Sequence, residues 1–101
     1  MTLSLRTVKG LTKCLIDEEI DPETLGVHIS EIDAGTRAHP PHTHEGVEAF
    51  YVLEGNGTIE IEGESHPLGP NEAVLLDPTK LHGLVNTGST PMRYMVIIAR
   101  P

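Results

Sequence analysis

Histidines and acidic residues gather in one short stretch, residues 37–48, which holds three of the six histidines of the chain. In an extended strand His42 and His44 point to the same side, because side chains alternate between the two faces. Glu48 would point to the same side of a continued strand, but an unbroken strand would place it about 20 Å from His42 at roughly 3.3 Å per residue. The chain must therefore turn before Glu48 if this carboxylate is to join the histidines. The dipeptide Glu45-Gly46 offers that turn, since glycine accepts backbone angles that other residues avoid. Imidazole nitrogens suit Zn, Fe, Ni or Mn and a carboxylate favours Fe(II) or Mn(II), so the stretch predicts a metal site.

The elements that would position these side chains are short strands. Ten glycines and eight prolines punctuate the chain and leave little room for helices. The one helical candidate, Asp17–Thr24, contains Pro22, which interrupts any longer run. Six segments carry β-branched or apolar residues, several in alternation, and are expected to be strands: Leu25–Ile32, Val47–Leu53, Thr58–Glu62, Ala73–Leu76, Leu81–Val85 and Met92–Ala99. This pattern predicts an all-β antiparallel sandwich or small barrel whose mouth can hold a ligand.

Length and charge restrict the class of protein. The 101 residues fit one domain, and folding could bury about 65% of the surface of the unfolded chain without disulfides. Seven basic against fifteen acidic residues give a net charge of −8, which argues against nucleic acid and anionic membrane as partners. No apolar stretch approaches the ~20 residues of a membrane span, and the start lacks the apolar core of a signal peptide, so we expect a cytoplasmic protein. Cys14 is the only cysteine, which excludes an internal disulfide.

Five residues of the central region follow a known pattern at its spacings: Gly35, His42, His44, Glu48 and Gly55. They resemble the first cupin motif, which has a glycine, a His-X-His pair, a glutamate and a closing glycine. Downstream, His82 precedes Asn86 as in the second cupin motif. Residues from about 26 to 98 therefore resemble a single cupin barrel, a jelly roll of two antiparallel sheets, within one domain of residues 1–101. Residues 1–24 would form an N-terminal strand or extension region.

The resemblance implies a set of metal ligands: His42, His44, Glu48 and His82. They would bind one divalent transition metal per chain, Fe, Mn, Ni or Zn, and an octahedral ion would keep two open positions for water, dioxygen or a chelating substrate. The second motif departs from the family's pattern, because Asp77 stands where proline is usual and Thr79 replaces a glycine. We expect this departure to shift the loop ahead of His82 rather than to remove the ligand. A degenerate cupin that keeps these histidines without metal stays open as the alternative.

Several further side chains are candidates for substrate binding. Arg37 or Arg93 could hold a carboxylate, since a guanidinium matches this group with two hydrogen bonds. His39, just ahead of the His-X-His pair, is expected at the rim of the cavity. Phe50 follows the alternation of its strand into the interior and would make the cavity partly apolar. His28 lies on the polar face of its strand, which could be cavity or solvent, and we favour solvent or a core contact.

The last segment, Met92–Ala99, is almost continuously apolar and predicts a strand buried on both faces. Such burial suggests that the strand packs against a second subunit, which would also cover an open edge of the sheet. We therefore expect a homodimer, the usual arrangement of cupins. From Asn86 onward the only ionisable side chains are Arg93, Tyr94 and Arg100, so the last strand offers no carboxylate to the cavity.

The cupin resemblance leaves the reaction open, because cupins include dioxygenases, isomerases, lyases and non-enzymatic binding modules. We favour a metal-dependent enzyme that acts on a small oxygen-rich molecule, either dioxygenase-like or an isomerase or lyase. Glu48 is the expected catalytic residue, as a metal ligand or, when free of the metal, as a general base. The alternative is a non-enzymatic ligand-binding or sensory cupin module.

Overall fold

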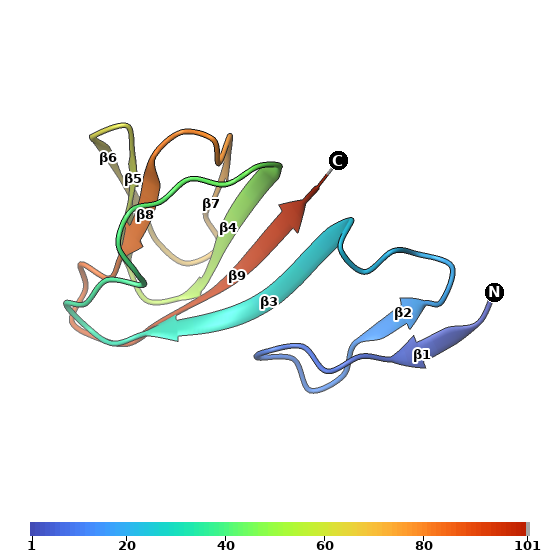
Figure 1. The fold of residues 1–101 in the computed structure, drawn as a ribbon. Coiled ribbons are helices and arrows are strands. Elements are labelled where there is room, and N and C mark those ends of the chain that lie inside the picture. Colours follow the sequence, from blue (N-terminus) through green and yellow to red (C-terminus); the bar gives the residue numbers. More distant parts are fainter. Residues whose placement is uncertain (101) are drawn as a thin grey trace.

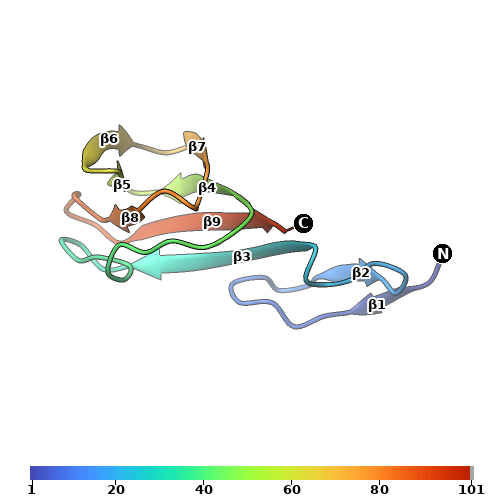
Figure 2. The same cartoon turned by 45° about the horizontal axis from the view of Figure 1, so that its top comes forward.

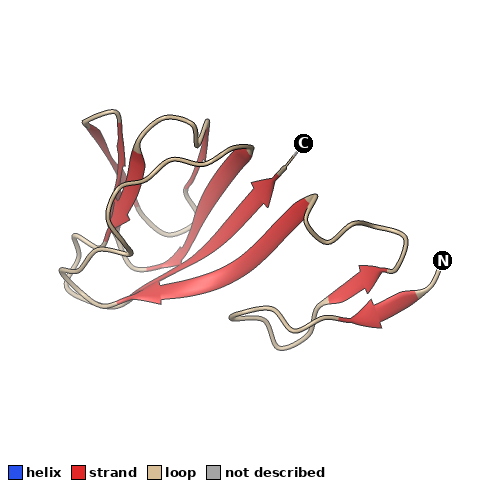
Figure 3. Cartoon of the chain, viewed as in Figure 1, coloured by secondary structure: helices blue, strands red, loops and turns tan. Residues whose placement is uncertain are grey.

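The structure is a computed structural model that describes residues 1–100, and this range contains nine strands and no helix (Figures 1 and 3). The strands are β1 (Leu3–Leu5), β2 (Leu15–Asp17), β3 (Leu25–Ile32), β4 (Val47–Glu54), β5 (Gly57–Ile61), β6 (Glu64–Leu68), β7 (Ala73–Leu76), β8 (His82–Val85) and β9 (Met92–Ala99). All their pairings are antiparallel, so the predicted all-β antiparallel class is confirmed. Within these residues no helix has the length and apolarity needed to span a membrane.

Two of the three sheets face each other and enclose the core (Figure 2). The larger sheet has the strand order β3-β9-β4-β7, and the smaller has the order β6-β5-β8. Both contribute fully buried side chains, with Val52 and Met92 from the larger sheet and Ile59 and Leu84 from the smaller. Two isolated bridges attach the segment between β3 and β4 to β8. The strand pairings of residues 1–100 therefore form the double-sheet sandwich expected of a jelly roll, without joining the two sheets into a closed ring.

Strand β4 shows how alternation in the sequence becomes position in the structure. Glu48, Phe50 and Val52 are buried on its inner face, whereas Ala49 and Tyr51 are half-buried on its outer face. This is the period of two that a strand imposes on its side chains. An acidic residue and an aromatic one thus lie next to each other on the interior face of the larger sheet.

The predicted helix Asp17–Thr24 is wrong. Strand β2 ends at Asp17, and turns follow up to β3. The carboxylate of Asp17 accepts the backbone N–H of Glu19 at 3.0 Å, and that of Asp21 accepts the N–H of Glu23 at 2.9 Å. Such side-chain bonds to nearby backbone groups favour turns over a helix. Strands β1 and β2 lie in residues 1–24, where the sequence indicated an N-terminal strand or extension region without bounds, and strand β6 was not indicated.

Strand β9 also differs from its prediction. It lies in the interior of the larger sheet, between β3 and β4, and is not an edge strand. One face is buried, with Met92 and Tyr94, whereas Arg93 and Met95 on the other face are half-buried. The two neighbouring strands of the same chain cover both edges of β9, so no second subunit is needed to cover an open edge there. The homodimer stays a prediction.

The β1–β2 hairpin extends from one end of the double-sheet body (Figures 1 and 2). The loop between β1 and β2 returns to the outer edge of β3, where the N–H of Ile29 donates to the carbonyl oxygen of Lys9 at 2.9 Å. Gly10 has a φ of +81°, and a Cβ at this position would lie 2.4 Å from the carbonyl oxygen of Ile29. Only glycine permits this close approach, which brings Lys9 beside β3.

Candidate metal centre

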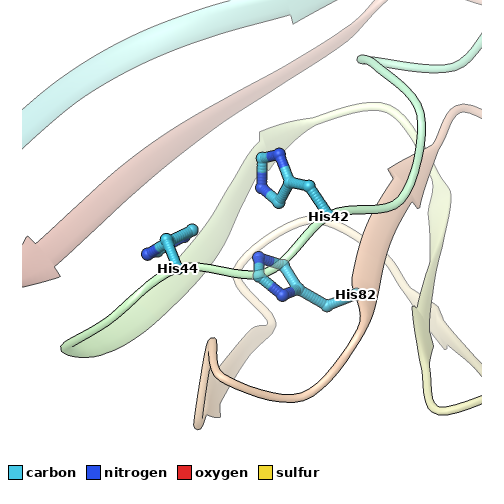
Figure 4. A group of neighbouring side chains, drawn as sticks. All are labelled: His42, His44 and His82. Atoms are coloured by element: carbon cyan, nitrogen blue, oxygen red, sulfur yellow. The ribbon is translucent and has the colours of Figure 1, made fainter.

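Three histidines from two segments of the chain converge inside the body (Figure 4). His42 and His44 lie on the segment that leads into β4, and His82 is the first residue of β8. His42 and His82 are joined by two backbone hydrogen bonds, with N–O distances of 3.0 and 3.1 Å. One possible ligand atom from each histidine lies within 4.8 Å of the other two. The backbone bridge thus brings together ligands that are far apart in the sequence.

The loop ahead of His82 holds His44 in place. The N–H of His44 donates to the carbonyl oxygen of Pro78 at 2.8 Å, and Pro78 is fully buried. The carboxylate of Asp77 accepts the hydroxyl of Thr79 at 2.6 Å and its N–H at 3.0 Å. These two hydrogen bonds, the hydroxyl bond first, lower the pKa of Asp77. The residues that depart from the cupin pattern therefore build a turn of their own, and His82 still joins the histidine pair.

Glu48 is only 4% exposed and lies against the histidines. Its Oε1 is 3.0 Å from Nε2 of His82 and 3.4 Å from Nε2 of His44. The turn predicted at Gly46 is present, with a φ of +107° and so close an approach to Ala99 that a Cβ would lie 2.4 Å from its carbonyl oxygen. Among residues 1–100, neither Oε1 of Glu48 nor Nε2 of His82 has a hydrogen-bond partner, although both atoms are buried. Such atoms are rare in folded proteins and indicate a site built for a further partner.

Hydrogen bonds at Nδ1 orient two of the imidazole rings so that their Nε2 atoms face Glu48. Nδ1 of His82 donates to the carbonyl oxygen of Lys80 at 2.8 Å, and Nδ1 of His44 donates to that of Glu45 at 3.0 Å. A neutral ring that donates from Nδ1 keeps its lone pair on Nε2. Burial, and after it the charges of the neighbouring histidines, lowers the pKa of His42 and favours its neutral form. Three imidazoles beside a carboxylate are a donor set that fits a divalent transition metal.

The cluster opens into a cavity of about 520 Å³ over the inner face of β3, β9 and β4. The ring centroid of Phe50 lies 6.5 Å from that of His82 and 6.0 Å from that of Tyr94, so these rings form an aromatic wall. Burial raises the pKa of the Tyr94 hydroxyl; a hydrogen bond with Ser30 opposes this rise, and the charge of Glu48 adds to it. Tyr94 therefore stays protonated at neutral pH and is able to donate a hydrogen bond.

Two of the predicted substrate-binding residues lie at the rim of this cavity. Arg37 lines it, but its guanidinium already forms an ion pair with Glu60. His39 is exposed and stacks on His42, with 4.2 Å between the ring centroids. Their role in substrate binding stays a prediction, as does that of Phe50.

Three further cavity residues were not assigned to the site from the sequence. The sequence left cavity or solvent open for the His28 side chain, and solvent was favoured over the cavity. His28 lines the cavity, so that choice was wrong. His28 and Ser30 are two residues apart on β3 and point to the same face, where Ser30 is buried. This alternation is the signal that could have placed His28 in the cavity. Lys9 and Arg100 also line the cavity, and nothing in the local sequence indicates this.

Comparison with known sequences assigns the family. A model of the cupin domain matches residues 28–98, which include the His-X-His pair, Glu48 and His82. The chain therefore belongs to the cupin family, as its sequence motifs predicted.

Two curated relatives carry names that refer to small-molecule binding. The oxalate-binding protein of Thermotoga maritima is 31% identical over 58 residues, which are 56% of this chain and 48% of the relative. Auxin-binding protein 1 of Arabidopsis thaliana is 32% identical over 72 residues, which are 61% of this chain and 36% of the relative. The chain thus matches about half or less of the length of these two proteins.

Solved structures share the fold. A predicted oxalate decarboxylase from Thermotoga maritima aligns with a TM-score of 0.73 at 24% identity, covering 86% of this chain and 76% of that one. The cupin domain of an XRE family transcriptional regulator from Enterobacter cloacae aligns with a TM-score of 0.70 at 24% identity, covering 78% and 84%.

Proposed function

We propose that this cupin binds one divalent transition metal and acts as a metal-dependent enzyme on a small oxygen-rich molecule. The ligands would be the four residues predicted from the sequence: His42, His44, Glu48 and His82. The observation that carries the proposal is the pair of buried atoms, Oε1 of Glu48 and Nε2 of His82, that face each other without a hydrogen-bond partner among residues 1–100. A cation would give both atoms a partner and offset the cost of burying a carboxylate.

The side chains around the cluster would bind and orient the substrate. Phe50 and Val96 form an apolar wall that excludes water from one side. The protonated hydroxyl of Tyr94 can donate a hydrogen bond to a substrate oxygen. When it is free of the metal, the carboxylate of Glu48 can accept a proton as a general base. A metal held here supplies Lewis acidity or dioxygen activation at its open positions.

The reaction type divides into two candidates. An oxygenase consumes dioxygen with its substrate, whereas an isomerase or lyase does not. Oxygen-electrode traces recorded with candidate substrates and metal-loaded protein separate the two. The relatives named for binding oxalate and auxin support a small organic molecule as the ligand.

The competing function is a non-enzymatic ligand-binding or sensory module. In that case a bound small molecule would raise the melting temperature, because it stabilises only the folded state, but no product would form over hours. The cupin domain is compatible with either function, since one fold can carry many activities.

Metal content tests the proposal most directly. Elemental analysis of protein purified without a His-tag or chelator should give about one equivalent of Fe, Mn, Ni or Zn per chain. His82→Ala should lose most of this metal, whereas His66→Ala should retain it, because the His66 side chain is 58% exposed on β6 and lies outside the cluster. Sub-stoichiometric metal that does not respond to His82→Ala, even after reconstitution, would overturn the metal site and favour the binding module.

Glu48→Gln tests the catalytic role separately. The amide keeps the shape of the side chain but cannot act as a base, so turnover should fall more than metal content. A variant that retains both metal and turnover would exclude this role for Glu48.

A further inference from the structure

The cavity contains an unusual share of the positive charge of the chain. Three of its seven lysine and arginine residues, Lys9, Arg37 and Arg100, line the cavity of a protein with a net charge of −8. Arg37 is neutralised by Glu60. Within the described range 1–100, Lys9 and Arg100 have no carboxylate at ion-pair distance. Among residues 1–100, two cations without an ion-pair partner therefore line the same cavity as the histidine cluster.

Lys9 is placed at the cavity by the backbone of its loop. The hydrogen bond from Ile29 and the close approach at Gly10 fix the loop against the edge of β3. Lys9 lines the cavity together with His28. After burial, the charge of Lys9 is the next cause of the lowered pKa of His28.

Arg100 approaches the same end of the cavity from β9. Its N–H donates to the carbonyl oxygen of Thr24 at 2.8 Å, which fixes the chain beside the start of β3. Its side chain passes over two glycines: Nη1 lies 3.7 Å from the position of a Cβ at Gly26, and Cγ lies 3.7 Å from that at Gly46. Lys9 and Arg100 thus form a cationic end of the cavity, at the first half of β3. The acidic residues Glu31 and Asp33, which also line the cavity, belong to the opposite end of that strand.

The cationic end is separated from the histidine cluster by the width of the sheet. Glu48 lies on β4 and His28 on β3, with β9 between these strands. Gly26, beside the Arg100 guanidinium, lies opposite Glu48 with Ile98 of β9 between them. Neighbouring strands are about 4.8 Å apart, so the backbone positions of the two ends are roughly 10 Å apart. A molecule as short as oxalate, with its carboxylates on adjacent carbons, would occupy only one of them.

We propose that the ligand of this cavity is a two-ended small acid, with a chelating oxygen group at the histidine cluster and a second, terminal carboxylate at Lys9 and Arg100. This inference rests on the proposed metal site and names its substrate class. Ammonium and guanidinium groups at a partly enclosed surface bind a carboxylate through charge-assisted hydrogen bonds. Both residues lie outside the matched cupin region, residues 28–98, so this specificity would be a feature of the flanking segments.

Two matched probes test the second carboxylate. 2-Oxoglutarate and 2-oxopentanoate have the same 2-oxo acid end and the same chain length, but one ends in a carboxylate and the other in a methyl group. Calorimetric titration of the metal-loaded full chain should show that 2-oxoglutarate binds about tenfold or more tightly, as expected for one or two charge-assisted hydrogen bonds. Lys9→Met and Arg100→Met should each remove much of this preference without changing metal content. Lys13→Met is the control, because Lys13 is an exposed lysine of the same loop that does not line the cavity.

The outcomes separate this inference from the proposed function, because metal uptake is measured first and without any acid. Wild-type protein that takes up no metal overturns the proposed function, and the two-ended ligand with it. Metal uptake followed by no binding of either acid, or by equal affinity for both, overturns the two-ended ligand alone. A preference that survives in Lys9→Met, in Arg100→Met and in the double variant overturns the assignment of these two residues.

Discussion

The two ends of the cavity are built in different ways. At the histidine end, His82 and Glu48 are buried, and backbone hydrogen bonds join the segments that carry the histidines. At the cationic end, Lys9 and Arg100 are exposed and come from the hairpin loop and from the residue after β9. The first end lies within the cupin region and the second lies outside it. The proposed metal centre and the proposed carboxylate-binding end can therefore be altered independently, and the following predictions use that independence.

Metal removal should have the largest effect. A ligand present at a hundred times its Kd stabilises the folded state by about 2.7 kcal/mol. For a domain of this size, that corresponds to an increase in Tm of about 10 °C or more. A chelator should therefore lower the Tm of wild-type protein and of His66→Ala by this amount, but leave His82→Ala almost unchanged. Scanning calorimetry of the three proteins measures this, and an equal response of all three would contradict a metal centre at His82.

Gly10→Ala should weaken the cationic end while sparing the histidine end. A Cβ at Gly10 would lie 2.4 Å from the oxygen of Ile29 and would push the loop that carries Lys9 away from β3. Gly63→Ala is the matched control, since Gly63 has nearly the same φ, +80° against +81°, but no heavy atom within 4 Å of its Cβ position. Both variants should lose roughly 1–2 kcal/mol for the left-handed backbone.

The two glycine variants should differ in ligand preference. Only Gly10→Ala should lose the preference for 2-oxoglutarate over 2-oxopentanoate, to about the extent expected for Lys9→Met. Denaturant unfolding and the same calorimetric titration give the two quantities. If Gly63→Ala lost the preference equally, the effect would come from general destabilisation and not from the position of the loop.

Asp77→Ala should have a smaller effect, confined to the histidine end. Loss of its hydrogen bonds to Thr79 loosens the loop whose Pro78 carbonyl holds the backbone of His44. Because Asp77 does not contact a ligand itself, we expect metal affinity to fall less than the roughly tenfold typical of residues that directly support ligands. A competition titration with a chelator measures this affinity, and a tenfold or larger loss would mean that the loop contributes more than one backbone contact.

The same variant predicts a pH dependence of stability. The folded-state pKa of Asp77 is lowered, so its contribution is fully present above the ordinary aspartate pKa of about 3.9 and is lost as the pH falls through the lowered value. Melting temperatures of wild-type protein and Asp77→Ala should differ at neutral pH and converge in acid. A constant difference at all pH values would show that the ionised carboxylate is not the cause.

The smallest effect on the single chain is expected at the exposed leucines of the hairpin. Leu5 and Leu15 are 73% and 50% exposed and lie opposite each other in the β1–β2 sheet. A two-stranded sheet is only marginally stable by itself, so the predicted homodimer would gain most stability by covering the β1–β2 sheet. Sedimentation should give a dimer for wild-type protein and a monomer for Leu5→Ser/Leu15→Ser, and a wild-type monomer would contradict the homodimer.

Part of the histidine end could be predicted from the sequence. The types and spacing of His42, His44 and Glu48 indicated a metal site and a turn at Gly46, and the turn is present. The extended strand assumed for His42 and His44 is not present, because both lie in the segment before β4 with a single bridge from His42 to His82, and His82 itself was indicated only by the resemblance to the second cupin motif. The helix predicted at Asp17–Thr24 failed, because side-chain hydrogen bonds to nearby N–H groups do not appear in the pattern of apolar residues.

The sequence by itself indicated the antiparallel β class through its turns and alternating residues, and its resemblance to the two cupin motifs indicated the family and the four candidate ligands, because a motif records residue types and their spacing. Only the tertiary structure decided that His82 bonds to the backbone of His42, that β9 is an interior strand and that Lys9 and Arg100 share a cavity with the histidines. These facts depend on which segments pair across the chain. Almost every residue type offers the same backbone N–H and C=O groups, so no local sequence pattern indicates which distant segment will pair with them.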